Sequence, residues 1–129
     1  MTDHTKTATI HISRAGEDRI PLGSGGAFGI AEWTGSGPGY LHAHHDSDMA
    51  IHVISGRLRF RLAGEKVDVG PGSTVFVPAG VAHDYDETMP SRYLIVAPQP
   101  VLDLLESLQK APRDQHPAIL RENNAGVVV

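Results

Sequence analysis

The sequence predicts an all-β domain, a sandwich or barrel of short strands, that ends in short helices. Two observations lead to this prediction. Between residues 28 and 96, short strand-like segments alternate with turns rich in glycine and proline, which is the rhythm of β-sandwiches and barrels. After Pro98 the pattern changes, because Val101, Leu104, Leu105 and Leu108 recur at the spacing of one helix face.

The strand-like segments come at regular intervals. In chain order they are residues 8–12, 28–34, 49–54, 57–62, 66–69, 73–77 and 93–96. Segment 57–62 reads Arg-Leu-Arg-Phe-Arg-Leu, and this strict alternation of charged and apolar residues is typical of a strand with one buried face. Ser55 and Gly56 are expected to end the strand before it. A second short helix is expected from Pro117 to Asn124, with Gly126 as its stop.

The length of 129 residues fits one domain. We divide it into an N-terminal segment (1–26), a barrel (27–97) and a helical segment packed on the barrel (98–129). The chain has no cysteine, so disulfides and thiolate metal sites are excluded. A polar N-terminus and the lack of any apolar run of roughly 20 residues argue against a signal peptide or membrane span. With a mild net charge of −4, we expect a soluble cytoplasmic protein that binds a small molecule and neither nucleic acid nor a membrane.

Histidine is concentrated in the middle of the chain. His42 and His44 lie two apart, so on a strand they project from the same face, whereas His45 projects from the other. His83 follows the Pro-Ala-Gly turn at 78–80, and in a barrel a facing strand can bring it to the first two. Three neutral imidazoles suit iron, nickel, manganese, cobalt, copper or zinc rather than calcium or magnesium. His52 is out of phase with this set.

These residues resemble the two sequence motifs of the cupins. The matching positions are Gly39, His42, His44 and Gly56 in the first motif, and Gly72, Pro78, Gly80 and His83 in the second. The resemblance covers about residues 27–97, and the tail after Pro98 is similar to the C-terminal helices of small monocupins related to bacterial quercetin dioxygenases. It implies a double-stranded β-helix, or jelly-roll, barrel with one metal ion on His42, His44 and His83.

The sequence departs from the cupin pattern at Met49, where cupins have a glutamate ligand. No glutamate occurs between Glu32 and Glu65, and the adjacent Asp48 faces the other way unless a bulge turns it inward. A thioether binds Fe(II) or Zn poorly, so Met49 is expected to line the pocket. Without the carboxylate the site is one charge more positive, which favours an anionic substrate that chelates through two oxygens.

The resemblance implies a metal-dependent dioxygenase, with iron the most expected metal, acting on a small enol, diketone, hydroxy-carbonyl or phenolic substrate. The alternatives are a non-redox metal cupin (a lyase, isomerase or cyclase) and a ligand-binding cupin without turnover.

Four aromatic residues are candidates for the surroundings of the metal. Tyr40 and Tyr85 each lie two residues from an expected ligand, so they either hydrogen-bond a bound anion as catalytic groups or pack at the barrel mouth. Phe60 and Phe76 are expected in the core or the pocket lining. A short open barrel leaves edge strands that need cover, so we also expect a homodimer.

Overall fold

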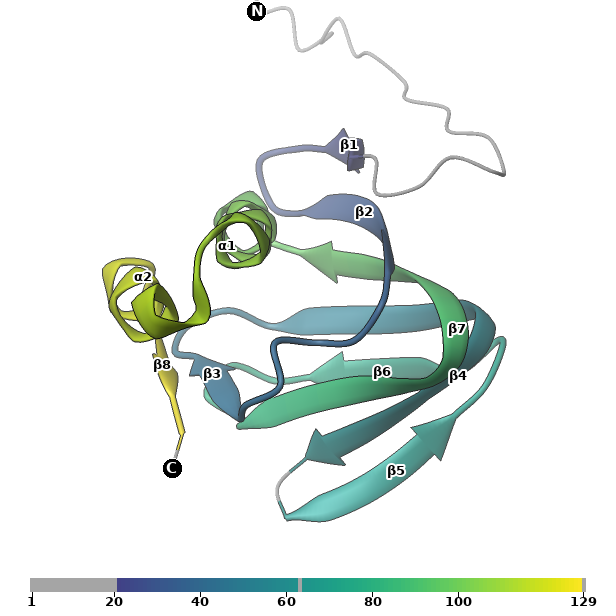
Figure 1. Ribbon diagram of the computed structural model, residues 1–129. Coiled ribbons are helices and arrows are strands. Elements are labelled where there is room, and N and C mark those ends of the chain that lie inside the picture. The colour runs from purple at the N-terminus through teal and green to yellow at the C-terminus, as the bar shows by residue number, and fades with distance from the viewer. Residues whose placement is uncertain (1–20, 63, 129) are drawn as a thin grey trace, which may run out of the picture.

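The computed structural model describes residues 21–62 and 64–128. Its elements, in chain order, are β1 (Pro21–Ser24), β2 (Gly29–Thr34), β3 (His42–His44), β4 (Met49–Leu62), β5 (Glu65–Val69), β6 (Thr74–Val77), β7 (His83–Ala97), α1 (Gln99–Lys110), the 3-10 turn η1 (Arg113–Gln115), α2 (His116–Glu122) and β8 (Ala125–Val127). The all-β class with short C-terminal helices is confirmed (Figure 1). The strand predicted at residues 8–12 lies outside the described residues.

Two long antiparallel strands, β4 and β7, form the frame of the barrel. They pair from Ala50 opposite Val96 to Leu62 opposite His83. The last residues of β7 also pair with β2, and its first residue pairs with β3. β4 pairs in addition with β5 and β6. Because each long strand has partners on both edges, the eight strands join in one continuous sheet that curls around a common interior.

β4 is one strand, although the sequence predicts two. Its register against β7 shifts at several points between residues 53 and 58, and Gly56 there has a φ of 84°. A Cβ at Gly56 would collide with Ser91 Oγ and with the Pro90 carbonyl oxygen. The residue that we expected to end the strand therefore lies at a bulge, where β4 bends and packs closely against β7.

The barrel core is apolar and almost fully buried. Its most buried members are Ile51, Val53, Leu58, Phe60, Tyr93 and Ile95. Phe60 and Met49 are buried in this core. Phe76, which we expected in the core or the pocket lining, is 60% exposed and does not belong to the core. The strand β6 alternates, and Val75 and Val77 occupy its inner face, so Phe76 between them has to point outward.

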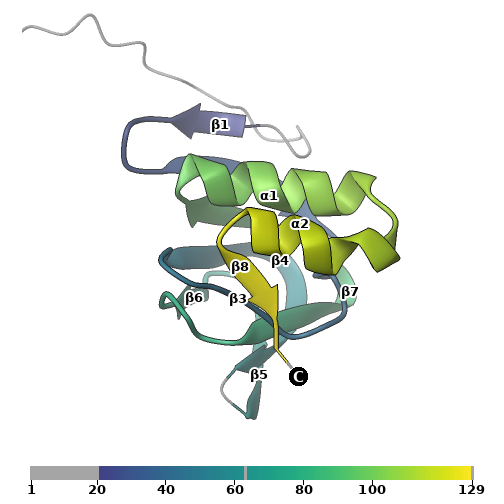
Figure 2. The same cartoon turned by 90° about the vertical axis from the view of Figure 1, so that its left-hand side faces the viewer.

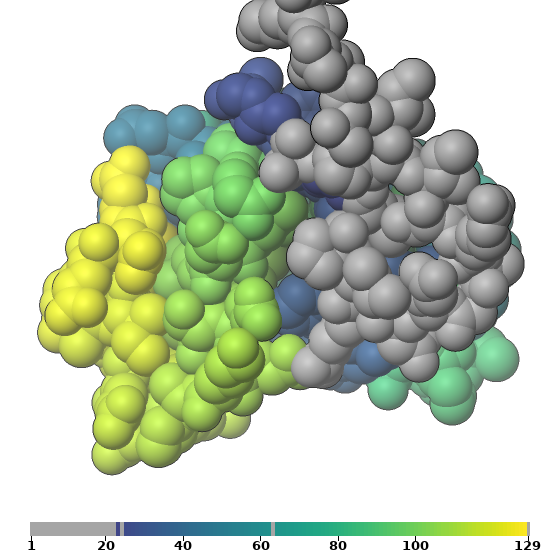
Figure 3. Space-filling view, turned by 90° about the horizontal axis from the view of Figure 1, so that it is seen from above, coloured from purple at the N-terminus to yellow at the C-terminus, as the bar shows by residue number. Residues whose placement is uncertain are grey.

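The C-terminal segment packs against one side of the barrel, where α1 and α2 lie side by side (Figures 2 and 3). The predicted helix face is correct, because Val101, Leu104 and Leu108 are buried. Leu104 and Leu108 form a second core cluster with Leu120 and with Ala125 of β8. None of the helices in the described residues is long and apolar enough to span a membrane.

Residues Ala125–Val127 form a strand, β8, whereas the sequence predicts only the end of a helix at Gly126. β8 pairs antiparallel with β3, with Gly126 opposite Ala43 and Ala125 opposite His44. The chain turns into β8 at Asn124, which has a positive φ of 56°, a conformation that asparagine tolerates better than most residues. β3 is therefore covered along its length by the last residues of the described chain.

Candidate metal centre

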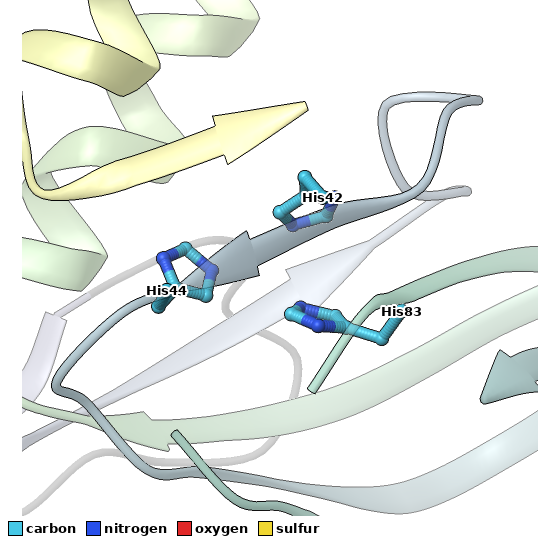
Figure 4. A group of neighbouring side chains, drawn as sticks. All are labelled: His42, His44 and His83. Atoms are coloured by element: carbon cyan, nitrogen blue, oxygen red, sulfur yellow. The ribbon is translucent and has the colours of Figure 1, made fainter. Parts of the chain in front are cut away.

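Three histidines converge at one end of the barrel (Figure 4). His42 and His44 come from β3, and His83 is the first residue of β7, directly opposite His42 in the register. One nitrogen of each lies within 4.8 Å of the others. Three nitrogens on a single ion lie about 3.0–3.6 Å from one another, given metal–nitrogen bonds of about 2.1 Å. The rings would therefore have to move closer together, by roughly 1 Å, to share one ion.

The hydrogen bonds of the rings leave nitrogens free inside the cluster. His83 donates from Nδ1 to the Val81 carbonyl oxygen at 2.9 Å, and His42 Nδ1 lies 3.3 Å from the Tyr40 carbonyl oxygen. His83 Nε2 and both nitrogens of His44 are buried without a hydrogen-bond partner in the described chain. Buried polar atoms are rarely left unpaired, and backbone carbonyls that fix the far ring nitrogen are typical of metal-binding histidines. The residues present fit a divalent metal ion.

The electrostatics of the cluster keep the three rings neutral. Burial, and then the neighbouring imidazoles of His83 and His44, lower the pKa of His42 to about 3. Burial also lowers the pKa of His44 to about 4, with His83 and His45 contributing, and it lowers the pKa of His83. A neutral imidazole has a lone pair to give to a metal, so the site is ready to bind an ion at neutral pH.

The turn that precedes His83 is tied to the strand that carries the other two ligands. The Gly80 N–H donates to the His44 carbonyl oxygen at 2.7 Å. The Ala79 N–H donates to Asp48 Oδ1 at 2.8 Å. Gly80 has a φ of 81°, which favours glycine. These bonds explain why a proline-glycine turn three residues before His83 accompanies the His-x-His pattern.

Two carboxylates close in sequence to the three ligands, Asp48 and Asp84, have other partners. Asp48 is exposed and caps the turn at Ala79. Asp84, fully buried, pairs with Arg61 and accepts a hydrogen bond from the Gly39 N–H. Among the described residues, the group that can hold a metal consists of the three histidines alone.

Both tyrosines proposed as catalytic residues have their hydroxyl groups engaged elsewhere. Tyr93 donates to the Gly35 carbonyl oxygen at 2.8 Å, so it accepts from Tyr85, whose oxygen is 2.7 Å away. His116 Nε2 donates to a carbonyl oxygen, so its Nδ1 accepts from the Tyr40 hydroxyl at 2.8 Å. Neither hydroxyl has a proton left for a bound anion in this arrangement. The ring of Tyr40 nevertheless contacts that of His42 edge-on.

The other histidines of the first motif lie outside the cluster, as their strand phase predicts. His45 is exposed, and His52 hydrogen-bonds Thr74 on an exposed surface. Sequence reasoning missed the surroundings of the site, namely Asp84 beside His83 and the buried His116 behind Tyr40. Asp84 could have been identified from the sequence, because it directly follows a ligand. No spacing pattern links His116 to the motifs.

The family model for the cupin domain matches residues 29–97, which is more than half of the chain. The chain belongs to the cupin family. This cupin has no match among curated proteins. The matched residues include all three histidines and end before α1, so the C-terminal helices and β8 lie outside the family match.

Solved structures share the fold at low sequence identity. A protein from Thermus thermophilus is 24% identical with a TM-score of 0.55, over 62% of this chain and 80% of that one. A protein with a cupin-2 domain from Shewanella frigidimarina is 17% identical with a TM-score of 0.56, over 67% and 84% of the two chains. A sugar phosphate isomerase of the cupin superfamily from Silicibacter pomeroyi is 23% identical with a TM-score of 0.51, over 56% and 50%. At these identities the likeness shows the fold alone.

Proposed function

We propose that this cupin is a metal-dependent dioxygenase that cleaves a small substrate bound through two oxygen atoms. The observation that supports it best is the ligand set, three buried neutral imidazoles with no carboxylate among them. Iron is the metal we expect, and a redox-active divalent ion held there would supply the activation of dioxygen.

The charge of the site selects the substrate class. His42, His44 and His83 are neutral ligands, so they offset none of the charge of a divalent ion. Met49, at the position where cupins have a glutamate, is buried in the barrel core and adds no charge either. A chelating anion, such as the enolate of a diketone or a hydroxy-carbonyl anion, balances this charge better than a neutral molecule does. The three rings would hold the ion, and its remaining positions would be left to the substrate and dioxygen.

The test begins with the metal content of protein purified without a tag and without added salts. The protein is then loaded with Fe(II) under argon and mixed with 1,3-diketones, hydroxy-carbonyl compounds and phenols while oxygen uptake is followed. We expect one dioxygen consumed for each substrate cleaved. Turnover without oxygen at the aerobic rate would overturn the dioxygenase and favour a lyase, isomerase or cyclase at the same site.

Paired variants connect the activity to the site. His83→Ala removes one of three ligands and should abolish both metal retention and oxygen uptake. His52→Ala changes a histidine of the same barrel that hydrogen-bonds Thr74 on the outside, and it should retain both. If His52→Ala releases the metal as completely as His83→Ala does, the assignment of the ligands is wrong.

A further inference from the structure

A cleft beside the metal centre is not accounted for by the proposed function. It lies between the loop at residues 36–38 and the C-terminal segment and has a volume of about 310 Å³. Trp33 and Tyr85 line it on the barrel side, and Leu105 and Leu108 of α1 line it opposite. Its volume is within the range of small-molecule sites. None of the three histidines lines it.

The walls of the cleft favour a flat apolar ligand. The partly exposed Trp33 and Leu105 supply most of the accessible apolar surface, because Tyr85 and Leu108 are almost fully buried. Such a surface binds an aromatic ring by contact and by removal of both surfaces from water. The cleft also includes Gly37, where a Cβ would meet Asp84 Oδ1 at 2.8 Å and the Tyr85 ring at 3.2 Å. A side chain at that position would have to displace the floor of the cleft.

The buried carboxylate of Asp84, which lies against Gly37, pairs with Arg61, and the exposed charge at the cleft is positive. Arg113 is exposed at its edge, and no aspartate or glutamate is among the residues that line it. One guanidinium N–H of Arg113 donates to the Gly39 carbonyl oxygen at 3.2 Å, and the group lies 5.6 Å over the Tyr40 ring. Among the described residues no carboxylate forms an ion pair with Arg113. A guanidinium has five N–H donors, so several are left for an anion.

The other basic residue of the cleft has its hydrogen bonds satisfied. His116 is buried, its Nδ1 accepts from the Tyr40 hydroxyl, and its Nε2 donates to the Ala111 carbonyl oxygen. It therefore forms a fixed wall, and Arg113 is the group with donors to offer. A guanidinium and a carboxylate form paired, charge-assisted hydrogen bonds. These bonds orient the ligand and select for its negative charge.

We infer that this cleft is a binding site for a small aromatic carboxylate. The ring lies between the aromatic pair, Trp33 and Tyr85, and the leucines of α1, and the carboxylate is bound by Arg113. The inference goes beyond the proposed dioxygenase and needs no metal, so each can fail without the other.

The binding test uses trans-cinnamate as the probe and the uncharged trans-cinnamamide as its matched control. Titrations are made in the presence of a chelator and are followed by ligand-observed NMR. Trp33 is the single tryptophan of the chain, so its fluorescence reports directly on the cleft. We expect saturable binding of cinnamate and binding of cinnamamide weaker by about tenfold or more, the effect of losing charge-assisted hydrogen bonds.

Three variants locate the site. Arg113→Gln should weaken cinnamate binding to the level of cinnamamide. Arg121→Gln removes the same charge from an exposed position on α2 and should bind as the unaltered protein does. His83→Ala should also bind normally, and loss of binding there would place the ligand at the histidines and overturn the inference. The inference would also be overturned if the two probes bound equally well, or if no saturable binding were found. It would likewise be overturned if Arg113→Gln bound cinnamate as tightly as the unaltered protein does.

Discussion

Replacing His44 by leucine should make the metal-free protein more stable. Both ring nitrogens of His44 are buried without a hydrogen-bond partner in the described chain, and one unsatisfied buried polar group costs about 1–3 kcal/mol. Leucine has a similar size and no polar atoms. We expect His44→Leu to raise the free energy of unfolding of the metal-free protein by about 1–3 kcal/mol at neutral pH.

The gain should increase in acid. The folded-state pKa of His44 is lowered from 6.5 to about 4, first by burial. Between these two values the unfolded chain binds a proton that the folded chain does not, so the stability of the unaltered protein falls as the pH decreases. By about pH 5 this amounts to about 2 kcal/mol, at about 1.36 kcal/mol for each pKa unit. Leucine does not titrate, so the gap between the two proteins widens by the same amount.

Urea unfolding followed by circular dichroism, with a chelator present, measures both effects. The exposed neighbour of His44, His45, supplies the control. His45→Leu makes the same substitution outside the barrel and should leave the free energy of unfolding nearly unchanged. Added metal at about 100 times its Kd should stabilise the unaltered protein by about 2.7 kcal/mol and His44→Leu by little. A metal-free His44→Leu that is less stable than the unaltered protein would refute the reasoning, because the ring would then be well accommodated without an ion.

Three further perturbations test how the site is held. Tyr40→Phe removes the donor to buried His116 Nδ1 and should lower the free energy of unfolding by about 1–2 kcal/mol in urea titrations; an unchanged value would contradict this hydrogen bond. Asp84→Asn leaves the half-exposed Arg61 without its anionic partner and should cost about 1 kcal/mol after allowance for solvent screening, visible as a lower Tm. Deleting residues 124–129 removes the partner of β3 and should weaken metal binding about tenfold or more in competition with a chelator; an unaltered affinity would show that β8 is dispensable.

The sequence was sufficient for the fold and for the three histidines, because both depend on local patterns. His42 and His44 share a face through the period of the strand, and the glycine and proline of the turn at 78–80 predict where the chain reverses before His83. Phe76 was misplaced for a related reason. Alternation says which residues share a face of β6, but not which face is inside, and only the packing of Val75 and Val77 decides that.

Features that depend on contacts between distant segments could not be predicted. The helical pattern of residues 116–122 says nothing about the pairing of β8 with β3 across the barrel wall. The strand β7 was predicted only at its apolar end, because residues 84–91 are mostly polar and include Pro90. The positions of Arg113 and His116 at the cleft follow from how α1 and α2 pack, which no spacing in the sequence encodes.

The C-terminal segment supports the candidate metal centre, although it lies outside the residues that define the family match. β3 is only three residues long, and it pairs with β7 at a single position. Most of its backbone partners come from β8, and the bond between the Gly80 N–H and the His44 carbonyl oxygen holds its far end. The same segment reaches the ligands a second way, through His116, the Tyr40 hydroxyl and the edge contact of Tyr40 with His42. The barrel therefore brings the three histidines together, and the final strand and helices hold two of them in place.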